Sequence, residues 1–354
     1  MKECCYFLGG ASPDGFKTRF GDTISDTDYR TYIIKGGPGT GKSSLMKRMA
    51  SAFPDAEKEF YCCSSDPDSL DAVVFTKSKV VFVDGTAPHT FDPEYPGAVQ
   101  QLVDLGSCWN SKMLQKNKPE IISKTADYLH YHAICRRYVT ALSSVVEDTA
   151  QIGKLAVNAE KLDGFTERFA KKILPKKQES EEGVILYRQL SALTPKGYLT
   201  NVPQDYTIYL LNDSLYYGSE KFLRGFTEIA CMKGYDVCVS LITVLSGCKF
   251  EHVFIPELKI AVMTATPINK LDISEKQLIN FRRFYDKNVV RHRKTRIKFN
   301  LGAIDEFRDE AVKALVSAKS EHDLLEAYYI KNIDFDKVSA IAEKLEDELK
   351  QIIR

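Results

Sequence analysis

The sequence predicts an α/β protein made of two copies of one unit, each a mostly parallel sheet flanked by helices with a helical C-terminal extension. Three observations lead to this fold class. Short apolar runs alternate with helical patterns over the first 120 residues, a charged segment then interrupts the pattern, and afterwards the pattern begins again. The chain has 354 residues, 44% of them hydrophobic, which is enough for two cores. We therefore place one domain at residues 1–174, a linker at 175–183 and a second domain at 184–354.

The elements of the first half follow from hydrophobic periodicity. Apolar runs predict three strands, at residues 32–34, 59–64 and 80–84. A helix is expected at residues 43–53. The stretch from 98 to about 174 is predicted to be mostly helical, because apolar residues recur there at intervals of three and four. The second half ends in a similar helical segment, from about residue 304 to 354.

The duplication rests on matching landmarks in the two halves. The sequence SPDGF at residues 12–16 resembles TPKGY at 194–198, and each is followed by a loop and an apolar strand. In both halves 13 residues separate a phenylalanine from a later proline, Phe75 from Pro88 and Phe254 from Pro267. The alternative is chance matching between two ordinary α/β domains. We prefer duplication of one unit.

Composition excludes some classes of protein. The chain carries 49 basic and 48 acidic residues, so no global field marks it as a nucleic-acid binder. Nine cysteines are present without a C-x-x-C pair, which makes a zinc site a weak interpretation. We find neither a signal segment at the N-terminus nor an apolar run approaching about 20 residues, the length that spans a bilayer. The expectation is a soluble cytoplasmic protein with reduced thiols and no membrane partner.

One motif carries chemistry. Residues 36–43, GGPGTGKS, match the pattern G-x-x-x-x-G-K-[ST] between an apolar strand and a helix. Glycines let successive backbone N–H groups converge on phosphate oxygens, and the helix N-terminus adds its dipole. The motif predicts a P-loop (Walker A) site in a P-loop NTPase-like domain, with Lys42 on the β- and γ-phosphates and Ser43 on Mg²⁺. The predicted nucleotide contacts are Gly37, Pro38, Gly39, Thr40, Gly41, Lys42, Ser43 and Ser44.

A magnesium site needs a second oxygen ligand. Residues 80–84 predict a buried strand that ends in Asp84, at the edge where ligands bind in sheets of this kind. Asp84 is therefore the expected partner of Ser43 in holding Mg²⁺, unless it only caps the loop. Gly85 follows it where many ATPases have a catalytic glutamate, so another group must orient an attacking water.

Two further candidates lie in loops near this edge. His89 follows Asp84 by five residues and is predicted to sense the γ-phosphate or place water, although a packed or solvated histidine is an equal alternative. Thr86 is a comparable hydrogen-bond donor. The turn after the second strand holds three carboxylates, of which Asp66 is the first choice for catalysis; ordinary turn and helix-capping chemistry is the alternative for all three, Asp66, Asp68 and Asp71.

The second copy lacks this chemistry. Ser219 stands at the position of Lys42, and Glu220 stands at the position of Ser43. A carboxylate and the bulky Tyr216 oppose a triphosphate by charge and by size, so the second site is predicted to be silent. Lys221, one position later, leaves open a contact with an anion.

The densest basic run lies at residues 291–296. It is a candidate phosphate or nucleic-acid patch, or a source of an arginine finger for the first site. Arg282 and Arg283 are candidates for the same roles. A solvated basic strand or loop is the ordinary alternative, and composition gives no further sign of a nucleic-acid partner.

These motifs together resemble an uncharacterised family of bacterial two-domain P-loop ATPases. The resemblance is carried by residues 9–16, 34–43, 63–71 and 84–89, and it extends to 194–198 and 253–258. It implies ATP binding and perhaps hydrolysis, but no particular substrate. The second domain of that family usually has its own phosphate loop, and this chain departs from it at Ser219 and Glu220.

The sequence predicts an Mg·ATP-binding hydrolase whose silent second domain serves as a regulatory or partner-binding platform. Two alternatives stay open: a small-molecule kinase, with Asp66 or Asp68 contacting the acceptor, and a nucleotide-responsive binding module without turnover. No N-K-x-D-like guanine signature appears near the end of the first domain, which favours ATP over GTP. The protein or small-molecule partner is not predicted.

Overall fold

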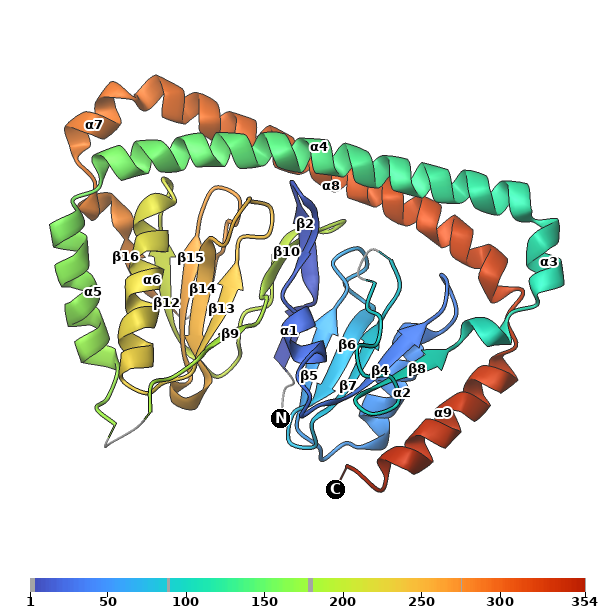
Figure 1. Cartoon of the computed structure of the whole chain (residues 1–354). Helices are drawn as coiled ribbons and strands as arrows, with labels where there is room; N and C mark the ends of the chain where they lie inside the picture. Colours follow the sequence, from blue (N-terminus) through green and yellow to red (C-terminus); the bar gives the residue numbers. More distant parts are fainter. Residues whose placement is uncertain (1–3, 88–89, 178–180, 275, 354) are drawn as a thin grey trace. The chain divides into compact units, whose positions relative to one another are not determined.

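The computed structural model describes residues 4–87, 90–177, 181–274 and 276–353 (Figure 1). It contains two six-stranded, mostly parallel sheets flanked by helices, one from each half of the sequence. This confirms the α/β class and the presence of two similar domains. Among the described residues, no helix is both long enough and apolar enough to cross a membrane.

The first sheet has the strand order β1-β5-β6-β7-β4-β8. Only β6 runs antiparallel to its neighbours. The start of β6 therefore lies at the same edge as the ends of the other strands. The strands are β1 (Cys4–Phe7), β4 (Arg30–Lys35), β5 (Lys58–Cys62), β6 (Leu70–Phe75), β7 (Val80–Asp84) and β8 (Gln100–Asp104).

The second sheet repeats this topology, with the order β9-β13-β14-β15-β12-β16 and a single antiparallel strand, β14. Strand by strand, the two orders are the same once each half is counted from its own first strand. The strands are β9 (Ile185–Tyr187), β12 (Thr207–Asn212), β13 (Val237–Leu241), β14 (Phe250–Ile255), β15 (Ile260–Ala265) and β16 (Gln277–Asn280).

The remaining elements also correspond in order. The first half adds β2 (Gly9–Ser12), β3 (Gly15–Thr18), α1 (Gly21–Ile24), α2 (Lys42–Ala52), η1 (Gly106–Cys108), α3 (Ser111–Lys116), α4 (Lys118–Ala156) and α5 (Ala159–Ile173). The second half adds β10 (Ser191–Thr194), β11 (Gly197–Thr200), α6 (Tyr217–Met232), η2 (Pro256–Leu258), η3 (Phe281–Phe284), α7 (Lys287–His292), α8 (Lys294–Ile330) and α9 (Phe335–Leu349). The helical extensions predicted at the end of each half are therefore α3–α5 and α7–α9.

Three details differ from the expectations. Residues 100–104 form strand β8 inside a stretch predicted as helical, because its two glutamines hide the strand in the apolar pattern. The basic run at 291–296 lies on α7 and the start of α8, so it is helical rather than a strand or loop. The thiols are not all free, since Cys5 and Cys62 of neighbouring strands form a disulfide.

The chain forms two compact units that do not follow sequence order. The first contains residues 1–10, 16–135 and 312–354, and the second contains 11–15 and 136–311. The predicted segments 1–174 and 184–354 thus each contribute residues to both units. The last helix of each half belongs to the unit that contains the other half's sheet. Helix α9 belongs to the first unit, and α5 belongs to the second.

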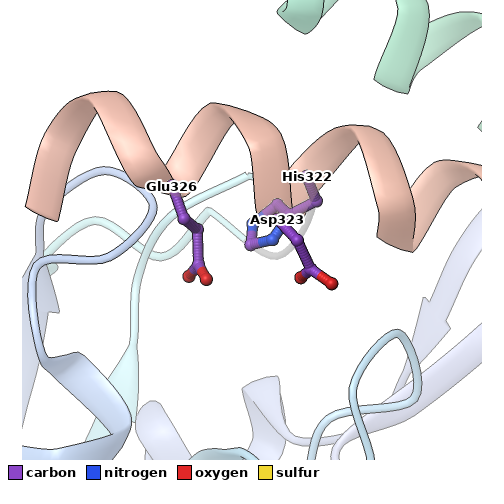
Figure 2. A group of neighbouring side chains, drawn as sticks. All are labelled: His322, Asp323 and Glu326. Atoms are coloured by element: carbon purple, nitrogen blue, oxygen red, sulfur yellow. The ribbon is translucent and has the colours of Figure 1, made fainter.

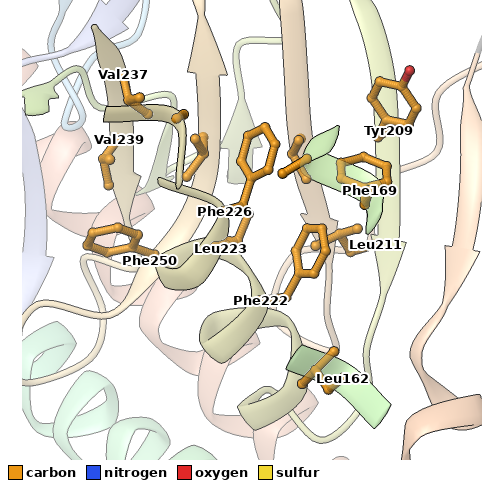
Figure 3. Packing of buried hydrophobic residues seen from close by; sticks show 14 of the residues in the cluster. Leu162, Phe169, Tyr209, Leu211, Phe222, Leu223, Phe226, Val237, Val239 and Phe250 are labelled. Atoms are coloured by element: carbon orange, nitrogen blue, oxygen red, sulfur yellow. The ribbon is translucent and has the colours of Figure 1, made fainter. Parts of the chain in front are cut away.

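Each unit has its own apolar core. In the first, Leu345 and Leu349 of α9 join a cluster with Met46 and Met49 of α2 and the inner residues of the sheet. In the second, α5 and α6 cover the sheet through a group of aromatic rings, in which Phe222 and Phe226 stack at 6.1 Å (Figure 3). These cores hold α2 and α6, and with them the loop before each helix, in fixed positions.

Candidate functional site

The loop at residues 36–43, here called the Gly-rich loop, joins β4 to α2 in the first unit. Gly39 and Gly41 have φ angles of 66° and 86°, a left-handed conformation that other residues adopt at a cost. Gly41 is also the N-cap of α2 and provides no capping side chain. The backbone N–H groups at this helix end therefore stay available to an anion.

Lys42 and Ser43 begin α2 and line a cavity above the loop. The Lys42 ammonium donates hydrogen bonds to the carbonyls of Gly36 and Gly37, at 3.0 and 2.8 Å. It also lies 3.6 Å from the Asp84 carboxylate. The Ser43 hydroxyl accepts a hydrogen bond of 2.9 Å from the amide of Leu70. The lysine is thus folded over the loop, with its charge directed at the same space as the loop amides.

Asp84 lies at the end of β7, beside β4 in the sheet. One of its oxygens accepts hydrogen bonds from the amide and hydroxyl of Thr86, at 2.9 and 2.5 Å. The other oxygen faces Lys42. Asp84, Ser43 and Thr86 all line the cavity, so the structure brings the two predicted magnesium ligands to one site. A hydroxyl and a carboxylate are the hard oxygen donors that Mg²⁺ prefers, and the residues fit that ion.

The three carboxylates of the turn before β6 have different surroundings. Asp66 is part of the turn itself, since its carboxylate accepts from the Ser69 hydroxyl at 2.7 Å and lies 3.9 Å from Lys319. Asp68 is exposed. Asp71, at the start of β6, is 4% exposed and lines the cavity. The structure therefore places Asp66 and Asp71 at the site, with Asp71 the more deeply buried.

The electrostatics of Asp71 reflect this position. Burial, together with the nearby Asp84 carboxylate, raises the pKa of Asp71 to about 8. A hydrogen bond from the Cys63 thiol and the charge of Lys42 act in the opposite direction. Burial and Asp71 in turn raise the pKa of Cys63, which stays a thiol at neutral pH.

The cavity has a volume of about 1000 Å³ and lies within the first unit. Its walls come from the Gly-rich loop, the turn before β6, the end of β7, η1, and the parts of α4 and α8 that belong to this unit. Two lining residues, Trp109 and His132, each have a buried nitrogen without a hydrogen-bond partner among the described residues. Such atoms are costly in a closed interior, and here both belong to residues that line the cavity.

Helix α8 places polar side chains over the Gly-rich loop. Figure 2 shows His322, Asp323 and Glu326 projecting from one stretch of this helix, with ligand atoms within 4.8 Å of one another. Glu326 accepts a hydrogen bond of 3.0 Å from the amide of Gly39, and Asp323 pairs with Lys319 at 2.9 Å. A metal ion would compete with both contacts. The structure therefore shows the Glu326 carboxylate accepting a hydrogen bond from one backbone amide of the Gly-rich loop, that of Gly39.

Sequence reasoning missed these α8 residues. Glu326 is 287 residues from Gly39, and no short motif marks it. The available signal was the spacing of Lys319, His322 and Glu326, which lie three and four residues apart and so share one helix face. Burial lowers the pKa of His322, and burial and His322 lower that of His132, so both histidines are neutral at neutral pH.

The other predicted candidates are distributed as follows. Thr86 holds Asp84, as described above, and His89 lies outside the described residues. Residues 291–296, Arg282 and Arg283 belong to the second unit. Of the described residues that line the cavity, none is an arginine, and the cations are Lys35, Lys42, Lys47 and Lys319.

Residues 213–220, here called the second loop, form the corresponding loop of the second unit. The side chain of Asp213, which belongs to this loop, bonds to the loop's own amides. Asp213 stands at the position of Gly36 and is 1% exposed. Its carboxylate accepts from the amides of Leu215 and Ser219 at 3.0 and 2.8 Å, and from the Tyr285 hydroxyl at 3.0 and 2.9 Å. An internal carboxylate thus occupies the space where the first loop leaves its amides open.

The neighbouring candidates in the second loop also have internal roles. Tyr216 has a φ of 62°, and its hydroxyl accepts from the amide of Ile268 at 3.2 Å. Lys221, the residue left open as an anion contact, pairs with Asp163 at 2.5 Å.

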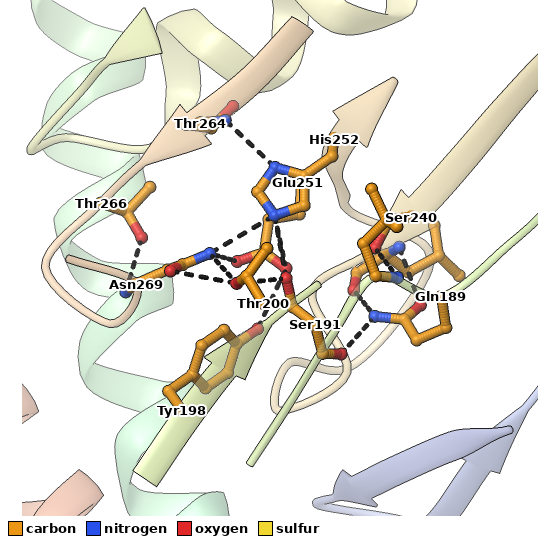
Figure 4. A network of polar contacts seen from close by, with 12 residues as sticks. Gln189, Ser191, Tyr198, Thr200, Ser240, Glu251, His252, Thr264, Thr266 and Asn269 are labelled. Atoms are coloured by element: carbon orange, nitrogen blue, oxygen red, sulfur yellow. Dashed lines mark hydrogen bonds and ion pairs between the residues drawn. The ribbon is translucent and has the colours of Figure 1, made fainter. Parts of the chain in front are cut away.

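A buried polar network lies close to the second loop in the sheet. Glu251 accepts from Asn269 at 3.0 Å and from Tyr198 at 3.1 Å, while the adjacent His252 accepts from the amide of Thr264 at 3.1 Å (Figure 4). Burial raises the pKa of Glu251 to about 7 and lowers that of His252 to about 3. Each of these side chains is hydrogen-bonded to other protein groups, so we interpret the network as part of the fold and not as a ligand-binding site.

Comparison with known proteins adds no assignment: no protein-family model, no curated protein and no solved structure matches the chain.

Proposed function

We propose that the chain binds Mg·ATP at the Gly-rich loop and hydrolyses it, and that the second unit is catalytically silent. The observation that carries the proposal is the convergence of loop amides, the Lys42 ammonium, the Ser43 hydroxyl and the Asp84 carboxylate on one cavity. Each group has the chemistry that a triphosphate and its magnesium require. The domains are accordingly of the P-loop NTPase-like type.

The roles of the protein groups follow from their chemistry. The loop amides and the α2 N-terminus bind the phosphate oxygens. Lys42 is released from the Gly36 and Gly37 carbonyls and bonds to the β- and γ-phosphates, which keeps its charge paired. Ser43 and Asp84 would hold Mg²⁺, which when bound neutralises phosphate charge. The rings of Trp109 and Tyr329, 5.5 Å apart at the cavity wall, offer a surface for the base.

A small-molecule kinase is the second candidate, and one observation favours it. The cavity continues past the Gly-rich loop to Tyr128 and His132 on α4, and its volume is at the upper end for small-molecule sites. An acceptor bound there would replace water as the nucleophile. The second unit would keep the same role under either function, as a regulatory or partner-binding platform.

Titration of the purified chain with ATP, GTP and Mg²⁺, followed by measurement of phosphate release, tests the proposal. Lys42→Ala should weaken ATP binding by about 100-fold, because a charge-assisted contact contributes up to about 3 kcal/mol. Lys77→Ala is the matched control, since Lys77 is exposed and pairs only weakly with Glu57 at 3.1 Å. Absence of ATP binding by the unmutated chain would contradict the proposal. Binding with phosphate release only in the presence of an acceptor would favour the kinase.

A further inference from the structure

Gly85 follows Asp84 where many ATPases have the glutamate that directs water, so the proposed hydrolysis needs another group for this role. The sheet supplies a carboxylate from a neighbouring strand instead. Strand β6 pairs with β7 in antiparallel register, with Ala72 opposite Val83. Asp71 precedes Ala72 and Asp84 follows Val83, so both acids lie next to the last of these pairs, at one edge of the sheet.

Three observations place Asp71 near the Gly-rich loop. The amide of Leu70, the residue before it, donates to the Ser43 hydroxyl at 2.9 Å. The charges of Lys42 and Asp84 both act on the Asp71 carboxyl, so all three lie within electrostatic reach of one another. The Asp71 side chain also lines the cavity although it is almost fully buried. It therefore faces the space between the Gly-rich loop and β7.

The surrounding residues hold this carboxyl in place. Cys63 donates a hydrogen bond to it from the end of β5. Position 71 lies in β6, at the point where the pairing with β5 is irregular, rather than in the preceding turn. Asp66, by contrast, is turned toward Ser69 and Lys319. A buried carboxyl held by a hydrogen bond suits the placement of a water molecule better than an acid of the turn does.

Resting on the proposed function, we infer that Asp71 is the catalytic carboxylate that orients the attacking water. The water oxygen forms a bond to the γ-phosphorus, and the bond from that phosphorus to the β,γ-bridging oxygen breaks, with its electron pair leaving on ADP. The water proton passes to the Asp71 carboxylate and then to the phosphate product. An acid at the start of an antiparallel strand thereby takes the place of the glutamate missing at position 85.

Asp71→Asn is the direct test, with Asp66→Asn as the competing variant and the exposed Asp55→Asn as the matched control. Affinity for Mg·ATP and the rate of phosphate release are measured on each variant, and urea unfolding checks that each is folded. Asp71→Asn should bind Mg·ATP within about threefold of the unmutated chain and release phosphate at least about 100-fold more slowly, the usual contribution of a positioned acid–base group. Asp55→Asn should match the unmutated chain.

Five results would overturn the inference. Turnover by folded Asp71→Asn within a few fold of normal would remove the catalytic role, and so would a loss confined to Asp66→Asn. Loss of Mg·ATP binding in folded Asp71→Asn would make it a binding residue instead. An unmutated chain that binds ATP without releasing phosphate would refute hydrolysis and this role while leaving the nucleotide site intact. A chain that binds no ATP would refute the proposed function as well.

Discussion

The two loops that follow β4 and β12 occupy the same place in the same topology. They differ in what their backbone amides contact. In the Gly-rich loop, the amides face a cavity, and a remote carboxylate, Glu326, reaches one of them. In the second loop, the Asp213 carboxylate accepts hydrogen bonds from two of the loop's own amides and from the Tyr285 hydroxyl. A single carboxylate in place of a glycine can therefore satisfy N–H groups that otherwise stay open to an anion.

The acids beside the two loops differ in the same way. In the first sheet Asp84 pairs with Ile34, and in the second sheet Thr264 pairs with Leu211, so Thr264 takes the place of Asp84. Glu251 is in the same way the counterpart of Asp71. Asp71 opens on the cavity, whereas Glu251 is enclosed by Asn269 and Tyr198. The second unit thus has a buried acid at the position of Asp71 but none at the position of Asp84, and protein groups enclose the acid that it has.

The largest expected effect is on the stability of the second unit. Asp213→Ala leaves the Leu215 and Ser219 amides without their acceptor, at about 2 kcal/mol each, so the free energy of unfolding should fall by about 4 kcal/mol. Urea denaturation measures it. Asp272→Ala is the control, since Asp272 is exposed and pairs only with Lys276 on the surface. A loss below about 1 kcal/mol would show that Asp213 is not what satisfies the second loop.

Glu251 provides the next largest effect, through pH. Its folded-state pKa of about 7 lies above its ordinary value of 4.5, so its contribution to stability is complete below pH 4.5 and is lost as pH rises through 7. Raising the pH from 4.5 to 8 should therefore cost the unmutated chain about 3 kcal/mol more than it costs Glu251→Gln. Denaturant midpoints across this range measure the difference. Glu257→Gln, which changes an exposed acid, should keep the pH dependence of the unmutated chain. Identical profiles for Glu251→Gln and the unmutated chain would mean that Glu251 does not titrate there.

The smallest effect concerns the Gly-rich loop itself. Glu326→Gln removes the negative charge that competes with phosphate for the Gly39 amide, so ATP should bind about fivefold more tightly, a gain of about 1 kcal/mol. Isothermal titration calorimetry measures the affinity. Glu321→Gln, on the same helix and paired with Lys124, should leave it unchanged. Weaker binding by Glu326→Gln would show that this side chain assists the nucleotide instead of competing with it.

Sequence predicts most where the residues concerned are close together in the chain. The Gly-rich loop can be recognised because one short stretch must provide the turn, the lysine and the hydroxyl, and Asp84 because it ends an apolar strand. The repeat of strands and helices could also be predicted, since each copy keeps the same order of periodic segments.

The rest depends on tertiary placement. Glu326 reaches the loop from a helix near the other end of the chain, and its role cannot be inferred from its neighbours in sequence. Asp71 reaches the sheet edge beside the Gly-rich loop only because β6 runs antiparallel, and no residue pattern in the sequence indicates that direction. Asp213 was visible as a departure from glycine, but its contact with Tyr285 joins residues 72 positions apart.

The number of Mg·ATP molecules bound per chain tests the contrast between the two loops most directly. Calorimetric titration should give one molecule per chain for the unmutated protein and the same for Ser219→Ala, because the second loop is already occupied by Asp213. Lys42→Ala should weaken that single binding event by about 100-fold. Two molecules per chain, or one molecule that binds Lys42→Ala with unchanged affinity, would contradict a single nucleotide site at the Gly-rich loop.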